Sequence, residues 1–436
     1  NYPGRFLAGQ LSAVGVEQKY NEILTGQDGG EIYEVDTRGA RVRVIDRQEP
    51  TPGNDLNLTI DAELSKVAYE ALEGRPGAVV VSRADSGQVL ALVSSPSFDP
   101  HLFIYPQVSN IFHSRGEAGT TPGDEEILAL FEDVQKPMFN RSIGGTYPPG
   151  STFKIVSATA GLEEEKINGQ TLIEDTGVIK VGAYSYSNWL FTKYGRTEGE
   201  INVVRAIQRS TDTFFYKVGE MLGAESLGNW AKAFGLGRLT EIDLEGEVEG
   251  LVPSPDWKEE VIGERWFLGN TYHLAIGQGD LLLTPLQVNM MMSVVANDGW
   301  LCRPSLMQNA KITRPRPDEV KKNQNENVKI KNNCKDLQLK AETLRLVKEG
   351  LVGACSPGGT AEIFFEFEPQ VACKTGTAEF GPVKASGYRD THAWLTAFVP
   401  ADKPEIVVTA LVEGGGEGSE VAAPIVKKVI EKWFEE

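Results

Sequence analysis

Ser151 and Lys154 lie three positions apart, directly after the turn-forming segment 147–150, which reads Tyr-Pro-Pro-Gly. Two prolines and a glycine force a turn and position the start of a helix. Side chains three residues apart share one face of a helix, so this serine and lysine can reach each other. A serine hydroxyl becomes a nucleophile when a base takes its proton, and a lysine kept neutral by burial or by a second cation is such a base. The spacing therefore permits acyl transfer through Ser151, with helix N–H groups available to a developing oxyanion.

Two further polar clusters occur much later in the chain. In Ser210-Thr211-Asp212, two polar side chains can project from one turn into a cleft, although either can instead cap the next helix. Lys374-Thr375-Gly376-Thr377 follows the strand-like residues 371–373. Its glycine lets a ligand backbone approach, and an exposed lysine and threonine at a strand edge can pair with a peptide and hold its carboxylate. The alternative is an edge-strand lysine that opposes aggregation.

The three clusters together are more specific than any one of them. S-x-x-K alone occurs by chance in many exposed helices. The order S-x-x-K, S-x-[N/D], K-T-G is the signature of class A β-lactamases and penicillin-binding proteins. We therefore expect Ser151, Ser210 and Lys374, although remote from one another in sequence, to meet at a single cleft.

The elements that must position these clusters follow from apolar patterning and turn residues. Strands are expected at residues 77–82, 88–93, 371–373, 392–399 and 405–412, and helices at residues 61–72, 341–353 and 423–434. The strands can form one five-stranded antiparallel sheet flanked by helices, an α/β (α+β) fold. Residues 95–137 are expected to be largely irregular, and residues 313–336 to be a mobile surface excursion.

Composition limits the classes of partner. The 436 residues carry a net charge of -18, so nucleic acid is an unsuitable partner. There is neither a membrane-spanning apolar run nor a signal segment, and we expect the chain to be a fragment that lacks its native start. The four cysteines show no zinc-binding spacing and are expected to be reduced and partly buried. A disulfide stays open, but its pairing cannot be read from the sequence.

At these motifs the chain resembles a class B penicillin-binding protein, and within that class the elongation-type penicillin-binding protein 2. The resemblance covers about residues 55–436, the expected transpeptidase domain, whereas residues 1–54 resemble the end of a non-catalytic pedestal or linker module. Beyond the three clusters it rests on Leu58-Thr59-Ile60-Asp61, Asn140-Arg141, Ala275-Ile276-Gly277-Gln278-Gly279, Thr284-Pro285-Leu286-Gln287, Gly359-Thr360-Ala361 and His392-Ala393-Trp394.

The resemblance implies a serine transpeptidase, β-lactamase-like fold and a role for each motif. Ser151 would be acylated, Lys154 would accept its proton, and Ser210 would relay a proton to the leaving amine. Lys374 would bind the substrate carboxylate. The other substrate-binding positions would be Asp212, Thr375, Gly376 and Thr377, and the N–H groups of Ser151 and Thr377 would form the oxyanion hole. No cofactor is expected.

The resemblance also implies substrates, partners and a location. The donors would be stem peptides ending in D-Ala-D-Ala, and β-lactams would acylate the same serine. The membrane partner would be a SEDS-type glycosyltransferase, at the outer face of the bacterial cytoplasmic membrane. Some relatives bind zinc between the first two motifs, but residues 173–200 contain no Cys or His, so no metal is expected there.

One departure from the family pattern concerns the second motif, which is S-x-D here instead of S-x-N. A carboxylate near Lys154 tends to keep that lysine charged, so the base is less well defined than the nucleophile. A Ser-His-Asp hydrolase is disfavoured because no G-x-S-x-G occurs and only four histidines are present. A β-lactamase, a D,D-carboxypeptidase and a non-catalytic β-lactam sensor stay open as alternatives.

Overall fold

A five-stranded antiparallel sheet organises the molecule, as the sequence predicts. The computed structural model describes residues 15–103, 122–308, 330–331, 333–385, 387 and 389–435. The strand order is β12-β13-β14-β3-β4, so β12 lies at one edge. The bounds are β3 Gly77–Arg83, β4 Val89–Ser95, β12 Ala372–Phe380, β13 Asp390–Val399 and β14 Ile406–Val412.

Both faces of this sheet are covered by helices, which explains why its inner strands are apolar without alternation. Val79, Val80 and Val81 are all fully buried, although successive strand residues point to opposite faces. One face packs on α13 (Pro285–Ala296), and the other packs on α4 (Ala62–Ala71) and α16 (Ala423–Phe434). Asp61 caps α4 by accepting a hydrogen bond from the backbone N–H of Leu64.

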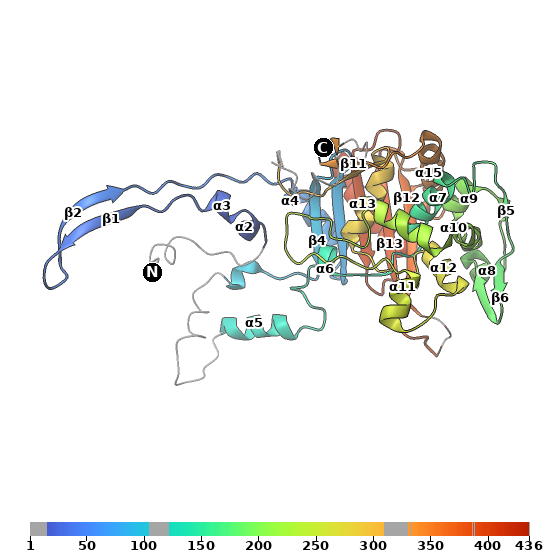
Figure 1. Cartoon of the computed structure of the whole chain (residues 1–436), viewed down its shortest axis with the longest axis horizontal. Coiled ribbons are helices and arrows are strands. Elements are labelled where there is room, and N and C mark those ends of the chain that lie inside the picture. The colour runs from blue at the N-terminus through green and yellow to red at the C-terminus, as the bar shows by residue number, and fades with distance from the viewer. Residues whose placement is uncertain are drawn as a thin grey trace.

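A group of helices lies beyond the β12 edge and forms the other side of the candidate site (Figure 1). The two longest members, α10 and α15, bury one face against their neighbours. The bounds are α7 Lys154–Glu163, α8 Trp189–Tyr194, α9 Val203–Arg209, α10 Asp212–Ala233, α12 Leu268–Ala275 and α15 Ala341–Ala354. Two small two-stranded sheets lie between α7 and α9 in sequence: β5 Ile173–Asp175 pairs with β8 Gly199–Ile201, and β6 Val178–Val181 forms a hairpin with β7 Tyr184–Ser187.

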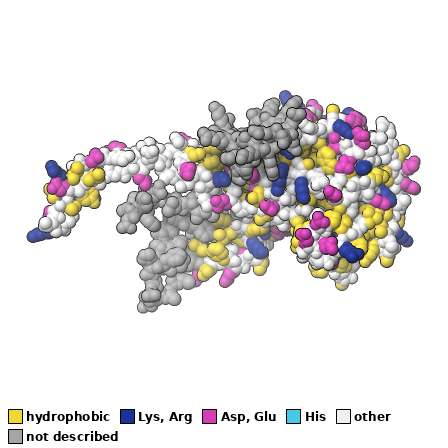
Figure 2. Space-filling view, in the orientation of Figure 1, with side chains coloured by type: hydrophobic (Ala, Val, Ile, Leu, Met, Phe, Trp, Pro, Cys, Tyr) yellow, Lys and Arg dark blue, Asp and Glu magenta, His cyan; other side chains and the backbone are white. Residues whose placement is uncertain are grey.

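The N-terminal part is a hairpin that extends away from this body (Figure 1). It consists of β1 (Gly30–Val35) and β2 (Arg41–Gln48), preceded by the short helices α2 (Gly15–Lys19) and α3 (Asn21–Leu24). All residues of both strands are exposed, including large apolar side chains that Figure 2 shows along the hairpin. A division of the chain near residue 54 fits this arrangement but stays a prediction.

One expectation about irregular segments needs correction, and a second falls mostly outside the described residues. Residues 95–137 contain the short 3-10 helix η1 (Pro100–Phe103) and an 11-residue helix, α5 (Pro122–Glu132). The sequence of α5 starts with proline and three acidic residues and continues with apolar residues at helical spacing, which is a helix-start pattern. Most of the excursion expected at residues 313–336 lies outside the described residues. Its described part includes β11 (Cys334–Asp336), which pairs with β9 (Trp300–Cys302).

The expectation of reduced cysteines is wrong. Cys302 is bonded to Cys334, and Cys355 is bonded to Cys373, so no free thiol is left. The first pair are direct partners across β9 and β11, and the second joins the end of α15 to β12. Strand register and helix docking bring these thiols together, and neither can be read from cysteine spacing. Within the described segments, no helix is both long and apolar enough to cross a membrane.

Candidate active site

Ser151 lies at the start of a helix that packs against the edge strand β12. It belongs to the 3-10 turn η3 (Gly150–Phe153), which continues directly into α7. Gly150 has a positive φ of 55°, and a Cβ there would lie only 3.0 Å from the carbonyl oxygen of Thr377. Glycine is therefore required both by the backbone conformation and by the close approach to β12. The Pro-Pro-Gly turn places Ser151 beside the third motif.

The turn before Ser151 is held by residues from the far end of the chain. The indole Nε1 of Trp394 donates to the carbonyl of Pro148 at 3.0 Å. The Tyr147 hydroxyl donates to Glu413 Oε1 at 2.6 Å, and the buried Arg141 donates to the same oxygen at 2.9 Å. The Asn-Arg and His-Ala-Trp segments, which contribute to the family resemblance, thus each supply a residue that holds this turn or its partner Glu413.

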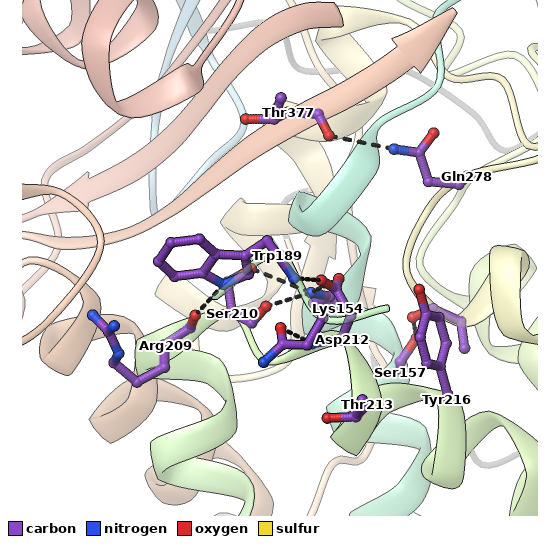
Figure 3. A network of polar contacts seen from close by, with 12 residues as sticks. Lys154, Ser157, Trp189, Arg209, Ser210, Asp212, Thr213, Tyr216, Gln278 and Thr377 are labelled. Carbon is purple, nitrogen blue, oxygen red and sulfur yellow. Dashed lines mark hydrogen bonds and ion pairs between the residues drawn. The ribbon is translucent and has the colours of Figure 1, made fainter. Parts of the chain in front are cut away.

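Lys154 is the first residue of α7, and its side chain is fully buried. Its Nζ donates to the carbonyl oxygen of Ser210 at 2.7 Å, to Ser210 Oγ at 3.2 Å and to Asp212 Oδ1 at 2.7 Å. Figure 3 shows this amino group at the centre of the polar network. The structure therefore brings the first and second motifs into direct contact.

Ser210 occupies a left-handed turn between α9 and α10, with φ 56° and ψ 39°. This conformation is uncommon for a residue other than glycine, asparagine or aspartate. The turn directs the Ser210 hydroxyl toward the amino groups of two lysines. The helix-cap alternative for this motif is wrong, because Thr211 is the N-cap residue of α10 and makes no side-chain cap hydrogen bond. The Asp212 carboxylate instead binds Lys154 and the backbone N–H of Trp189.

Lys374 lies inside β12 and is fully buried, so the expectation of an exposed edge lysine is wrong. Its Nζ donates to Ser210 Oγ at 2.9 Å and to the Thr375 carbonyl at 3.1 Å. The strand is at the edge of the sheet, but the α9–α10 turn lies over the lysine. Ser210 Oγ thus lies between Lys154 and Lys374 and within hydrogen-bond distance of both.

The remaining residues of the third motif face different surroundings. Thr375 Oγ1 is 2.9 Å from Thr360 Oγ1, in the Gly-Thr-Ala segment that the sequence singles out. A Cβ on Gly376 would lie 3.0 Å from the Thr152 side chain. Glycine at this position therefore lets the turn that carries Ser151 pack closely against β12. Thr377 accepts a hydrogen bond from Gln278 at its carbonyl and donates one to Glu417 Oε2 at 3.1 Å through its hydroxyl.

Burial and charge lower the pKa of both lysines. Desolvation lowers the pKa of Lys154, and the neighbouring Asp212 carboxylate opposes that shift. Desolvation also lowers the pKa of Lys374 well below its ordinary range, and the charge of Lys154 lowers it further. With both lysines protonated, two buried cations would share one carboxylate. Loss of one proton leaves a neutral amine beside a neutral ion pair, which is the arrangement that a proton acceptor needs.

Several residues that hold Asp212 carry no signal in the sequence. Asn188 Oδ1 accepts from the Asp212 backbone N–H at 3.2 Å, and Asn188 Nδ2 donates to the buried Asp175 at 2.8 Å. Asp175 also accepts from the Thr213 hydroxyl at 2.6 Å. The Trp189 indole donates to the carbonyl of Arg209, next to Ser210 (Figure 3). Short polar side chains of this kind are common in loops, so only the contacts reveal the network.

No group of three or more His, Cys, Asp or Glu side chains suited to a metal ion occurs among the described residues. The acidic residues nearest the site are already engaged by protein donors. Asp212 binds Lys154 and the Trp189 N–H, and Asp175 accepts from Gly177, Asn188, Glu198 and Thr213. The groups that the site offers include the hydroxyls of Ser151 and Ser210, the amines of Lys154 and Lys374, and backbone N–H groups.

Comparison with known proteins places this geometry in a family. Residues 77–431 match the model of the penicillin-binding protein transpeptidase domain, and residues 7–58 match that of the penicillin-binding protein dimerisation domain. The chain is 33% identical to the peptidoglycan D,D-transpeptidase MrdA of Acinetobacter baumannii, over 99% of this chain and 61% of the relative. It is 32% identical to the protein of the same name from Escherichia coli K12, over 94% of this chain and 63% of the relative. The chain thus spans about three fifths of the length of these curated relatives.

Solved structures give the same result. The complex between penicillin-binding protein 2 and MreC from Helicobacter pylori contains a chain with a TM-score of 0.81 and 29% identity, covering 97% of this chain and 72% of that one. Pseudomonas aeruginosa penicillin-binding protein 2 in complex with WCK 5153 has a TM-score of 0.78 and 30% identity, covering 100% of this chain and 87% of that one. The similarity therefore includes nearly the whole chain as well as the site.

Proposed function

Because the chain belongs to the penicillin-binding protein transpeptidase family, we propose that it is a peptidoglycan D,D-transpeptidase that works through a serine acyl-enzyme. One observation carries the proposal. The Ser210 hydroxyl lies 3.2 Å from Lys154 Nζ and 2.9 Å from Lys374 Nζ, so three remote motifs share one site beside Ser151. The names of the relatives support the same activity.

In the acylation step, Ser151 Oγ attacks the carbonyl carbon of the penultimate D-Ala of a stem peptide. The hydroxyl proton passes to the amine of Lys154, which has first given a proton through Ser210 to Lys374, as the new C–O bond forms. Backbone N–H groups of Ser151 and Thr377 stabilise the oxyanion, and the close approach of Gly150 to the Thr377 carbonyl supports this pairing. The peptide C–N bond then breaks, and the departing D-Ala amine receives a proton through Ser210. An amine from a second stem peptide reverses these proton transfers and releases the cross-linked product.

The two buried lysines support proton relay through Ser210. A hydroxyl between two amines can accept from the protonated one while it donates to the neutral one. Asp212 favours the charge on Lys154, whereas Lys374 has no carboxylate within hydrogen-bond distance among the described residues. A proton taken up at Lys154 can therefore move by way of Ser210, with Lys374 as the other end of the relay.

Substrate binding uses the free edge of β12. An extended peptide can add to an exposed sheet edge, and β12 is the last strand of the sheet. Lys374 attracts the terminal carboxylate from beneath the surface, and Thr375, joined to Thr360, offers a hydroxyl to it. The partners we propose are stem peptides ending in D-Ala-D-Ala, β-lactams that acylate Ser151, and a SEDS-type glycosyltransferase at the outer face of the cytoplasmic membrane. Solved relatives include a penicillin-binding protein 2 in complex with MreC and a peptidoglycan synthase complex.

The domain assignment is part of the same proposal. We assign residues 55–436 to the transpeptidase domain and residues 1–54 to the end of a pedestal or linker module. The dimerisation-domain match over residues 7–58 supports the second assignment, and so does the hairpin that extends from the main body. In this arrangement the linker would hold the catalytic domain away from the membrane.

A fluorescent penicillin tests the proposed function. We expect one long-lived adduct per chain on Ser151, read by gel fluorescence and by intact mass, and none on Ser151→Ala. Lys154→Ala should slow acylation by several orders of magnitude while the circular dichroism spectrum is retained. Rapid release of hydrolysed drug would indicate a β-lactamase. A stable adduct together with no turnover of D-Ala-D-Ala peptides would indicate a sensor, and an adduct on Ser151→Ala would refute the assignment.

A further inference from the structure

Two oppositely charged side chains face each other where β12 lies opposite α8. Lys193 Nζ in α8 is 3.7 Å from Glu417 Oε1. The other carboxylate oxygen of Glu417 accepts a hydrogen bond from the Thr377 hydroxyl at 3.1 Å. The Lys193 and Glu417 side chains are 47% and 46% exposed, respectively, so both lie at the surface of the site.

The ion pair joins the two walls of the site. Helix α8 belongs to the second-motif wall, because Trp189 at its start donates its backbone N–H to Asp212 and its indole N–H to the Arg209 carbonyl. Glu417 belongs to the third-motif wall through its bond to Thr377 on β12. A peptide bound between these walls along β12 can therefore meet both Lys193 and Glu417.

The position of the pair along β12 indicates which substrate residue it meets. This step rests on the proposed function, in which the terminal carboxylate lies at Lys374 and Thr375 and the scissile carbonyl lies at the Thr377 N–H. The residue before the acylated D-Ala then lies farther along the strand, past Thr377. Because residues of a strand advance about 3.3 Å each, a long side chain on that residue can reach a carboxylate bound to Thr377.

We propose that Lys193 and Glu417 determine specificity for donor stem peptides in which the residue before D-Ala-D-Ala carries a side chain ending in both an ammonium and a carboxylate. Glu417 binds the ammonium and Lys193 binds the carboxylate. Positive and negative charges then alternate across the contact. Glu417 exchanges the Lys193 ammonium for the ligand ammonium, and Lys193 exchanges the Glu417 carboxylate for the ligand carboxylate. A side chain with only an ammonium would take Glu417 and leave Lys193 beside a like charge.

The exchange is energetically accessible. Exposed ion pairs contribute at most about fivefold to an equilibrium, so opening the Lys193–Glu417 pair costs little. Both side chains have several rotatable bonds and can separate to admit a ligand group. Selectivity arises because the zwitterionic side chain satisfies both charges, whereas a lysine side chain satisfies one. The expected discrimination is therefore also about fivefold.

Two synthetic donors test this proposal, one with meso-diaminopimelate and one with L-lysine before D-Ala-D-Ala. The measured quantity is the ratio of kcat/KM for release of terminal D-Ala from the two donors. We expect the wild-type protein to prefer diaminopimelate about fivefold, and Lys193→Gln to remove that preference. Glu417→Gln should lower kcat/KM for both donors, since both carry the ammonium. In the Glu417→Gln variant the side-chain amide oxygen can still accept the hydrogen bond from Thr377. A lower kcat/KM therefore reports the missing negative charge.

A matched control separates this effect from general loss of charge. Lys217 forms a similarly exposed ion pair with Glu220, at 2.9 Å and with 42% exposure of each side chain, on α10. Lys217→Gln should leave the ratio unchanged. An unchanged ratio in Lys193→Gln, or no preference in the wild-type protein, would overturn the proposal. Penicillin labelling of Ser151 in the same preparations shows separately whether the proposed function holds.

Discussion

Replacing Asp212 with asparagine should destabilise the protein by an amount that depends on pH. Asp212 Oδ1 lies 2.7 Å from the fully buried Lys154 Nζ, and Lys374 lies on the other side of Ser210. Removing one member of a buried ion pair costs about 3–5 kcal/mol while the remaining charge persists. Asparagine has a similar shape, and its amide oxygen can still accept the hydrogen bond from the Trp189 N–H.

The pH dependence follows from the lowered pKa of Lys154. Burial lowers this pKa, and the Asp212 carboxylate opposes the shift, so the substitution lowers the pKa further. Below the new pKa Lys154 is charged, and the full destabilisation applies. As the pH rises from the new pKa to the wild-type pKa, Lys154 becomes neutral in the folded variant. The difference in the free energy of unfolding between the two proteins, here called the gap, then narrows by about 1.4 kcal/mol per pH unit. Above the wild-type folded pKa this contribution is gone.

Urea unfolding of both proteins, from about pH 6 to about pH 10, measures this gap. The acid limb of the penicillin acylation rate should also move to lower pH in the variant, because Lys154 loses its proton more readily. Asp298→Asn is the control, since Asp298 forms an exposed ion pair with Lys348 at 2.6 Å and should change stability by less than about 1 kcal/mol. A large gap that stays constant across this range would refute the account of Lys154 as a titrating group whose charge Asp212 favours.

Three other substitutions or treatments have defined outcomes. Replacing Cys355 and Cys373 with alanine removes the disulfide between α15 and β12, which closes a separation of 18 residues, and should lower the free energy of unfolding in urea titrations by about 3 kcal/mol. Gly376→Ala places a methyl group 3.0 Å from the Thr152 side chain, and should cost about 1–3 kcal/mol and slow penicillin labelling of the nucleophile. Thr213→Val removes a donor from the buried Asp175 carboxylate and should lower the melting temperature by the equivalent of about 1–3 kcal/mol, whereas Thr213→Ser should retain wild-type stability more closely. An unchanged unfolding midpoint in any of these cases would contradict the corresponding contact.

Local patterns in the sequence were enough to predict most of the catalytic domain's framework. The final helix has the same bounds, residues 423–434, in prediction and structure, because its apolar residues repeat at helical spacing. All five strands of the sheet were recognised from short apolar runs between turn residues, and they form the predicted antiparallel sheet. The predicted third-motif strand was too short, since β12 continues through the motif to Phe380. Polar residues hid that continuation because they resemble the end of a strand.

The sequence also identified the residues of the candidate site by type and order, although their roles stay predictions. Ser151, Lys154, Ser210 and Lys374 were selected because three short motifs occur in one order along the chain. A motif records which chemical groups are available at a given spacing. It carries no information on how deeply they are buried, which explains why Lys374 was expected at the surface.

Only the tertiary structure decided how these groups act on one another. Lys374 Nζ and Ser210 Oγ are 2.9 Å apart although 164 residues separate them in sequence, and both disulfides were likewise invisible to local patterns. The α9–α10 turn lies over β12, and burial between them lowers the pKa of both lysines. Tertiary packing also sets Glu417 opposite Lys193. Secondary structure depends on neighbours in sequence, whereas proton affinity and charge pairing depend on neighbours in space, and those are defined only when the chain is folded.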